Sequence, residues 1–207
     1  MLSAILLSLS LLSTVHCYPD VESSNIQTPG DSGKFYYFAY GSNLLAKRIH
    51  IKNPSAVFYN SGKLAKHRLD FNVDNTLWLG AGATIVEDDS SEVWGSLWTL
   101  DVDQVHFLDE QESVPEGMYF AKNVTITTPE GTQVLARTYQ MTNNPKKLAS
   151  GEDLPYERRP SNTYLQVIAL GAIESRLPAE YIGFIFSFPT NGKMAAEERR
   201  KELGYPY

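Results

Sequence analysis

The sequence is almost without cysteine, and the only one, Cys17, ends a distinctive N-terminal segment. An uncharged apolar run from Ala4 to Leu12 precedes Val15-His16-Cys17, a pattern typical of a secretory signal peptide and its cleavage site. Cleavage there would remove every thiol, so the mature protein would have neither disulfides nor a cysteine nucleophile. We therefore predict that residues 1–17 are a signal peptide and that the protein is secreted and extracellular.

Several other features that would point to a function class are missing. The net charge is −6 and the cationic stretches are short, which argues against nucleic-acid binding. Beyond the signal segment, no apolar run is long enough to be a membrane anchor. The remaining histidines, His50, His67 and His106, lack metal-ligand spacing, so no metal is expected. No G-x-S-x-G motif occurs, which argues against a serine hydrolase.

The glycine-rich stretch from Gly80 to Thr84 is not a dinucleotide-binding fingerprint. Its sixth position is Ile85 rather than glycine or alanine, and no helical pattern follows. We interpret its glycines as places where the backbone approaches another segment closely beside the site. No nucleotide or other cofactor is expected.

The rest of the chain reads as one domain with a polar lead-in. Residues 18–34 are rich in proline, glycine and small polar residues, and they predict a flexible segment outside the core. Residues 35–207 form the predicted domain, and a hydrophobic content of 43% is ordinary for a globular protein.

Within that domain, strand-like patterns come first and helical patterns last. Strands are predicted at 35–38, as several short pieces within 56–100, and at 119–128 and 133–141. Helices are predicted from residue 44, from 101 to about 112, from 161 to 177 and from 193 to 203. The polar segment 142–160 is predicted to be a mobile flap over a pocket. This order indicates an α+β domain.

The stretch FYYFAYGSNLLAKRIH, residues 35–50, predicts a strand, a tight turn and a helix. Gly41 suits the turn, and Ser42 or Asn43 is suited to cap the helix. Backbone N–H groups at such a joint favour an anion such as a carboxylate. An ordinary strand-to-helix connection fits the spacing equally well.

The helix predicted from residue 101 places acidic side chains near its end. Asp101 and Gln104 have the spacing of an N-cap and its reciprocal partner. Glu112 falls on the core-facing side, with Asp109 beside it and Glu110 roughly opposite. From spacing alone Glu112 also fits a surface carboxylate, because glutamate is seldom buried.

The motifs themselves resemble those of the γ-glutamylcyclotransferases, and YFAYGSN resembles the substrate-binding loop of that family. Further family-like segments follow in order: Asn53-Pro54-Ser55-Ala56, Leu69-Asp70-Phe71, Glu92-Val93-Trp94-Gly95, Leu108-Asp109-Glu110-Gln111-Glu112, Gly117-Met118-Tyr119, Tyr139-Gln140-Met141-Thr142-Asn143 and Gly171-Ala172. The resemblance covers about residues 35–181.

The resemblance implies a small mixed β-barrel with packed helices, and Glu112 as the catalytic residue. The substrate-binding residues that it implies are Tyr37, Phe38, Ala39, Tyr40, Gly41, Ser42 and Tyr139. One departure from the family pattern is Ser113, which stands where the family has glycine after the catalytic carboxylate.

The implied reaction converts the γ-glutamyl group of γ-glutamyl amino acids to 5-oxoproline and releases the amino acid. The partner is thus a small γ-glutamyl molecule, with a homodimer left open as the assembly. Two alternatives stay open: glutathione or γ-glutamylamines as substrate, and a non-catalytic secreted binding protein on the same fold. Asn123-Val124-Thr125 is a glycosylation acceptor if the chain is secreted.

Overall fold

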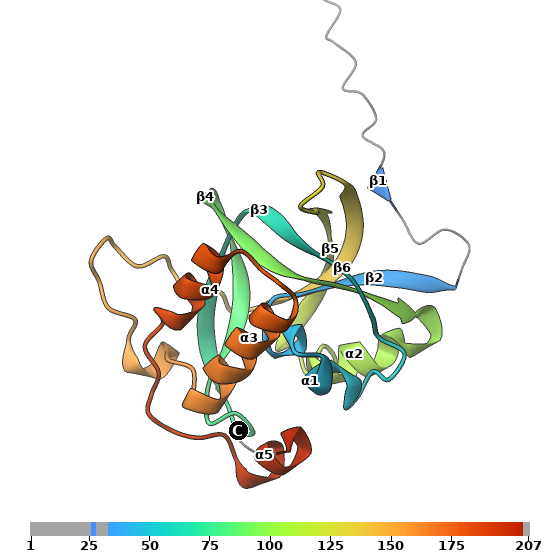
Figure 1. Cartoon of the computed structure of the whole chain (residues 1–207). Coiled ribbons are helices and arrows are strands. Elements are labelled where there is room, and N and C mark those ends of the chain that lie inside the picture. Colours follow the sequence, from blue (N-terminus) through green and yellow to red (C-terminus); the bar gives the residue numbers. More distant parts are fainter. Residues whose placement is uncertain (1–25, 28–32, 205–207) are drawn as a thin grey trace, which may run out of the picture.

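The computed structural model describes residues 26–27 and 33–204 (Figure 1). The predicted signal peptide and most of the lead-in lie outside these residues. One part of the lead-in is described: β1 (Ile26–Gln27) pairs in parallel with Gln133 and Val134. The lead-in therefore contains a short strand that the sequence pattern did not predict.

The domain is built on a closed sheet. Its main strands are β2 (Lys34–Ala39), β3 (Val57–Asn75), β4 (Gly80–Asp101), β5 (Tyr119–Thr127) and β6 (Gln133–Met141). The strand order is β1-β6-β2-β4-β3-β5, and an additional pairing of β6 with β5 closes a five-stranded barrel. β2 and β6 run parallel while the other pairs within the barrel are antiparallel. The predicted fold class, a small mixed β-barrel with packed helices, is confirmed.

The prediction of several short strands between residues 56 and 100 was wrong, because β3 and β4 are two long, bent strands. Their pairing shifts register between Ala65 and His67 and again between Asn72 and Asp74. Lys66 and Val73 have φ of 57° and 56° at these points. Such bulges bend a strand without ending it. The interruptions in the apolar pattern are therefore bends that let the strands wrap around the barrel.

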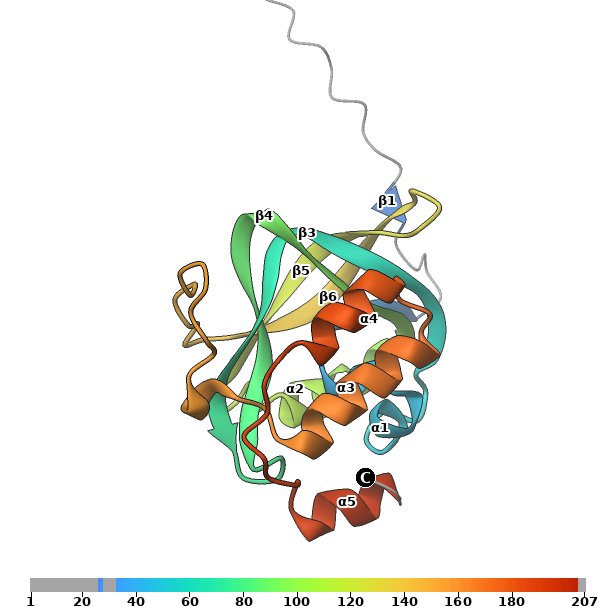
Figure 2. The ribbon, with the colours of Figure 1, turned by 60° about the vertical axis from the view of Figure 1, so that its left-hand side comes forward.

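The helices are short, and most follow the barrel strands. In chain order the helical segments are η1 (Ser42–Leu44), α1 (Ala46–His50), η2 (Val102–Gln104), α2 (Val105–Gln111), η3 (Tyr156–Arg158), α3 (Asn162–Glu174), α4 (Ala179–Phe186) and α5 (Glu197–Leu203). Figures 1 and 2 show α3 and α4 beside the barrel, with α1 and α2 near one of its ends. The sequence pattern did not predict α4. None of the helices in the described part of the chain is long and apolar enough to cross a membrane.

Capping differs from the prediction at the helical segment that begins after Asp101. Asp101 makes no capping hydrogen bond; its carboxylate pairs with Lys34 at 2.6 Å, and Gln104 accepts a hydrogen bond from Ser55 instead. At α3, by contrast, the Ser161 hydroxyl accepts the backbone N–H of Tyr164, as an N-cap does. Asp101 therefore links β4 to β2, and Gln104 links η2 to the segment before β3, so the two side chains do not form a capping box.

The longest helix, α3, packs directly on the turn that follows β2. Gly171 makes this possible, since a Cβ at that position would lie only 2.4 Å from the backbone nitrogen of Leu45. Leu44 and Leu165 are buried in the same core cluster. The position of the η1 turn is therefore fixed from both sides, by β2 and by α3.

Candidate active site

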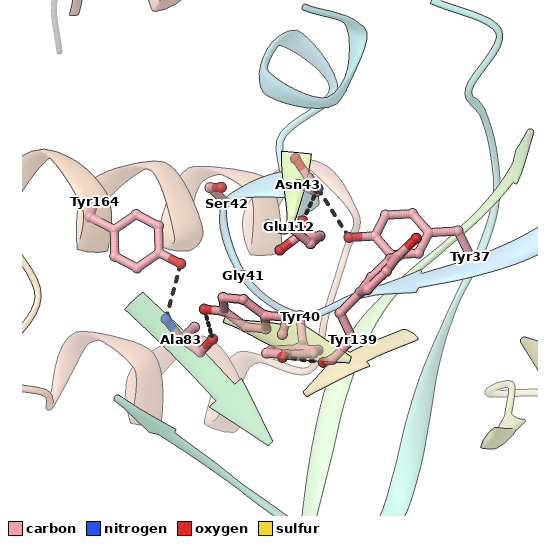
Figure 3. Close-up of a pocket in the computed structure, with 10 residues that line it drawn as sticks. Tyr37, Tyr40, Gly41, Ser42, Asn43, Ala83, Glu112, Tyr139 and Tyr164 are labelled. Carbon is pink, nitrogen blue, oxygen red and sulfur yellow. Dashed lines mark hydrogen bonds between the residues drawn. The ribbon is translucent and has the colours of Figure 1, made fainter. Parts of the chain in front are cut away.

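A small, partly enclosed cavity lies where the β2–η1 turn and the end of α2 meet strands β4, β5 and β6 (Figure 3). The centre of a water molecule can move through about 40 Å³ of it. Its lining residues are Tyr37, Tyr40, Gly41, Ser42, Asn43, Ala83, Glu112, Tyr119, Tyr139 and Tyr164. Residues far apart in the sequence are thus gathered around a single carboxylate.

The predicted binding loop contributes to the cavity, though not with every residue. Tyr37, Tyr40, Gly41 and Ser42 line it. Phe38 and Ala39 do not: the side chain of Phe38 is fully buried in the main core cluster, and Ala39 packs in a second cluster. Alternation along β2 explains the case of Phe38, because neighbouring side chains of a strand point to opposite faces.

Neither Ser42 nor Asn43 caps a helix with its side chain, contrary to the prediction. Asn43 is buried, and its Nδ2 donates to the Tyr37 hydroxyl at 3.0 Å and to Oε1 of Glu112 at 3.3 Å. The amide therefore joins the β2 strand to the carboxylate in the middle of the cavity (Figure 3).

Glu112 lies directly after α2, as the sequence predicts, and its backbone N–H donates to the carbonyl of Leu108 at 2.9 Å. Oε1 also accepts from Nε2 of Gln111 at 3.3 Å. Burial raises the pKa of the Glu112 carboxyl, and this effect outweighs the positive charge of Arg48 and the Gln111 hydrogen bond, which both lower it. The carboxylate is therefore more basic than an exposed glutamate.

The backbone after Glu112 turns through Ser113, which has a φ of 51°. This left-handed region is favoured by glycine, because a Cβ crowds the backbone there. Ser113, predicted to depart from the family pattern, thus stands where the backbone conformation favours glycine.

Tyr139 lines the cavity, but its hydroxyl is directed to other partners. It donates to Oδ1 of Asp109 at 2.6 Å and accepts from Nε of Arg137 at 3.0 Å. Arg137 in turn pairs with the same Asp109 oxygen at 2.6 Å. The contribution of Tyr139 to the cavity is therefore its ring, which packs edge-on against Tyr37.

Two tyrosines that the sequence reasoning missed complete the lining, and both contact the backbone of Ala83. The Tyr119 hydroxyl donates to the Ala83 carbonyl at 2.8 Å, and the Ala83 N–H donates to the Tyr164 hydroxyl at 3.1 Å. A Cβ at Gly82 would lie 3.0 Å from the Tyr119 hydroxyl. The prediction that this glycine stretch makes a close approach beside the site is confirmed for Gly82.

The buried tyrosines of the cavity remain protonated at ordinary pH. Burial raises the pKa of Tyr37, Tyr40 and Tyr119 well above its usual range, and that of Tyr164 to about 12. Because the Tyr164 oxygen accepts from Ala83, its own proton is free to be donated to a ligand. The wall around Glu112 thus consists of neutral hydrogen-bonding groups.

The segment 142–160, predicted to be a mobile flap over a pocket, does not line this cavity; several of its residues line a separate hollow beside β3 and α4. None of its residues lines the cavity, and Arg68 ties it to the barrel by donating to the Pro145 carbonyl at 2.7 Å. Across the described residues, no cluster of three His, Cys, Asp or Glu side chains is placed to hold a metal ion.

Comparison with known proteins shows which family this chain resembles. Residues 92–185 match the AIG2-like family. The γ-glutamylcyclotransferase of Bos taurus is 42% identical over 174 residues, which is 81% of this chain and 87% of the bovine one. That of Homo sapiens is 41% identical over 158 residues, which is 74% of this chain and 78% of the human one.

The fold agrees with the sequence comparison. A solved γ-glutamyl cyclotransferase structure superimposes with a TM-score of 0.72 at 37% identity, covering 82% of this chain and 98% of that one. The chain therefore belongs to the γ-glutamylcyclotransferase family.

Proposed function

We propose that the protein cyclises the γ-glutamyl group of γ-glutamyl amino acids to 5-oxoproline and releases the free amino acid, with Glu112 as the catalytic acid and base. The activity class follows from the family, whose bovine and human members are named γ-glutamylcyclotransferases. The observation that carries the residue assignment is the position of Glu112: its carboxylate faces a partly enclosed, tyrosine-lined cavity, and burial raises its pKa.

The reaction begins with the α-ammonium group of the substrate, which is not nucleophilic while it is protonated. Glu112 takes one proton, and the free amine attacks the γ-carbonyl carbon of the same molecule. A C–N bond forms and closes a five-membered ring, while the carbonyl oxygen becomes an oxyanion. A carboxylate whose pKa is raised toward neutrality is suited to this step, because the best general base has a pKa near the working pH.

The second half of the reaction reverses the role of Glu112. The oxyanion collapses, the bond to the leaving amino acid breaks, and Glu112 returns its proton to the departing amine nitrogen. The ring nitrogen loses its second proton, which the released amine takes up to become an ammonium group. No water is consumed and no redox step occurs. The products are 5-oxoproline and a free amino acid, and the enzyme returns to its starting state.

Positioning supplies much of the rate, because the attack is intramolecular. Well-oriented intramolecular reactions gain on the order of 7–11 kcal/mol over their bimolecular counterparts. The small cavity would hold the γ-glutamyl chain folded, with its amine at Glu112. The Tyr164 hydroxyl lines the cavity and would be a neutral donor for the substrate carboxylate or the oxyanion.

We further propose that the protein is exported, which rests on the signal-peptide pattern of residues 1–17. Asn123 then becomes available for glycosylation, and its side chain is exposed on β5. N-terminal sequencing of protein secreted by expressing cells should begin at Tyr18, and intact Met1 on the extracellular form would contradict export by cleavage. The homodimer stays a prediction.

The experiment that tests the proposed function measures 5-oxoproline release by the purified mature protein. γ-Glutamyl-alanine and glutathione are supplied in parallel, with Glu112→Gln as the matched inactive control. Release from the dipeptide supports the proposal, and release from glutathione alone moves the substrate to the alternative. Binding of both without any product would leave a binding protein on a cyclotransferase fold.

A further inference from the structure

A buried polar cluster lies behind Glu112, on the side away from the cavity. Arg48 of α1 is only 4% exposed and Asn53 is fully buried. Nη1 of Arg48 and Nδ2 of Asn53 both donate to Oε1 of Gln111, at 3.4 and 3.3 Å. Nε2 of Gln111 then donates to Oε1 of Glu112 at 3.3 Å. A single side-chain amide thus connects a buried cation to the proposed base.

The chemistry of the neighbours fixes the direction of the Gln111 amide. A guanidinium has only donors, so the Gln111 group that faces Arg48 must be the carbonyl oxygen. The NH₂ group of the same amide is then left facing Glu112, where an ionised carboxylate has only acceptors. Reversing the amide would oppose donor to donor on one side and acceptor to acceptor on the other.

The interposed amide keeps Arg48 from pairing directly with Glu112. An arginine in contact with a carboxylate stabilises its charged form strongly, which would make it a poor proton acceptor. Here the charge of Arg48 acts only through space, and the hydrogen bond that Glu112 receives comes from a neutral amide. Burial then remains the larger influence on the pKa of Glu112.

Both donors to Glu112, Asn43 and Gln111, meet the same oxygen, Oε1. Oε2 accepts no hydrogen bond from the described residues. The carboxylate is therefore held by one oxygen while the other is available to a ligand (Figure 3).

We propose that Gln111 is a positioning residue of this active site: its amide separates Arg48 from Glu112 and anchors Oε1, so that Oε2 receives the substrate proton. The assignment deepens the proposed function and rests on it for the identity of the proton donor. It names a residue that touches no substrate but sets the orientation and basicity of the one that does.

The charged and titratable groups that face Glu112 are few. They are Arg48 from α1, Tyr37 from β2, Tyr40 after it, Tyr119 from β5 and Tyr164 from α3. The tyrosines are neutral at ordinary pH, so Arg48 is the charged neighbour whose effect Gln111 moderates.

The test is a carbon-13 NMR titration of the Glu112 carboxyl, identified by its loss in Glu112→Gln, together with pH profiles of kcat/KM. Gln111→Met keeps the length of the side chain and removes its donor. The hydrogen bond from Gln111 favours the charged form of Glu112, so its loss should move the titration midpoint of Glu112 to higher pH. The acidic limb of the kcat/KM profile should move in the same direction. A misplaced base should lower kcat by about 10- to 100-fold, with a smaller change in KM.

Gln111→Glu is the second variant, since it keeps an acceptor for Arg48 and Asn53 and so preserves the buried cluster if Gln111→Met fails to fold. It places a second carboxyl beside Glu112, which should also move the Glu112 midpoint upward, because two neighbouring carboxylates resist ionising together. Glu110→Gln is the control: Glu110 is the exposed neighbour in the sequence, and its replacement should leave the midpoint and kcat unchanged.

A lower melting temperature of the Gln111 variants with an unmoved Glu112 midpoint and an unchanged kcat would show a purely structural role and overturn the proposal. The NMR titration does not depend on turnover. If the wild-type protein released no 5-oxoproline from any γ-glutamyl substrate, the proposed function would fail while the titration still decided the role of Gln111.

Discussion

Glu112 and Asp70 are both carboxylates shielded by the fold, yet their partners are of opposite kinds. Asp70, on β3, is 6% exposed and receives Arg68 at 3.2 Å and Arg158 at 2.5 Å. Its backbone neighbour Phe71 adds an N–H at 2.8 Å. Within the part of the chain that the structure describes, the carboxylate of Glu112 receives two side-chain amides, both at 3.3 Å.

This difference shows how one protein uses the same functional group in two ways. Two guanidinium groups neutralise Asp70, and Arg68 and Arg158 also bind backbone carbonyls of Pro145 and Lys146. The pair thereby fastens the 142–160 segment to the barrel. Among the described residues, the cation that acts on Glu112 is Arg48, which is kept behind an amide, so the carboxylate retains the ability to exchange a proton.

The largest effect should come from Glu112→Gln, which removes the proton-accepting group and keeps its shape. We expect turnover to fall by about 10²- to 10⁴-fold, the range that general acid–base catalysis supplies. Single-turnover release of 5-oxoproline measures this directly, with binding of 5-oxoproline followed by calorimetry as the control for an intact cavity. Substantial turnover in the variant would remove Glu112 from its proposed role.

The change Asp70→Asn should lower the free energy of unfolding and leave catalysis intact. It leaves two guanidinium groups buried without their counter-charge, and removing one partner of a buried ion pair costs about 3–5 kcal/mol. Urea unfolding measures the loss, with the exposed Asp103→Asn as the matched control. The folded fraction should retain its kcat. Equal stability of the two variants would mean that Asp70 contributes no more than a surface carboxylate.

The pH dependence of the melting temperature should test the raised pKa of Glu112. Since burial raises the pKa of Glu112 above its unfolded value, its neutral form is favoured by the fold, and its contribution is lost as pH rises through the folded pKa. The melting temperature of Glu112→Gln should therefore gain on that of the wild type as pH rises through this window. A constant difference across the window would contradict a raised pKa.

The smallest effect is expected on stability, from replacing Ser113, the residue that follows Glu112. Ser113→Gly should stabilise the fold by up to about 1 kcal/mol, because glycine tolerates the left-handed conformation that costs other residues about 1–2 kcal/mol. Ser113→Ala keeps the Cβ and is the control that should gain nothing. The difference in urea midpoints between the two variants is the decisive measurement, and destabilisation by glycine would count against strain at this position.

The parts predicted from sequence are those with a local signature. Helical spacing, a local pattern, predicted the placement of Glu112 just beyond α2, and the order of strand and helix patterns predicted an α+β domain. The closed barrel was implied only by the resemblance to the family, because pairing between distant strands leaves no local pattern. The prediction of short strands was wrong because bulges interrupt the apolar pattern without ending β3. The Asp101–Gln104 cap was wrong because Lys34 and Ser55, distant in sequence, compete for those side chains.

The missed cavity residues have no local signature at all. Tyr164 looks like one more core aromatic of α3, and Tyr119 like an ordinary strand residue. Their role depends on barrel closure and on the packing of α3, which bring both hydroxyls to the backbone of Ala83. Phe38 was included with its strand neighbours, although β2 turns its side chain into the core.

Barrel closure also determines at what stage of synthesis and folding the cavity around Glu112 can form. The hydroxyl of Thr138 on β6 donates to the carbonyl of Phe38 on β2, a contact that spans 100 residues. Pairings between such distant segments form late, because their loop-closure entropy has to be overcome first. During synthesis, Glu112 leaves the ribosome well before Tyr164, which closes the far wall of the cavity. A nascent chain that ends before α3 therefore carries the proposed catalytic carboxylate but not the complete cavity around it.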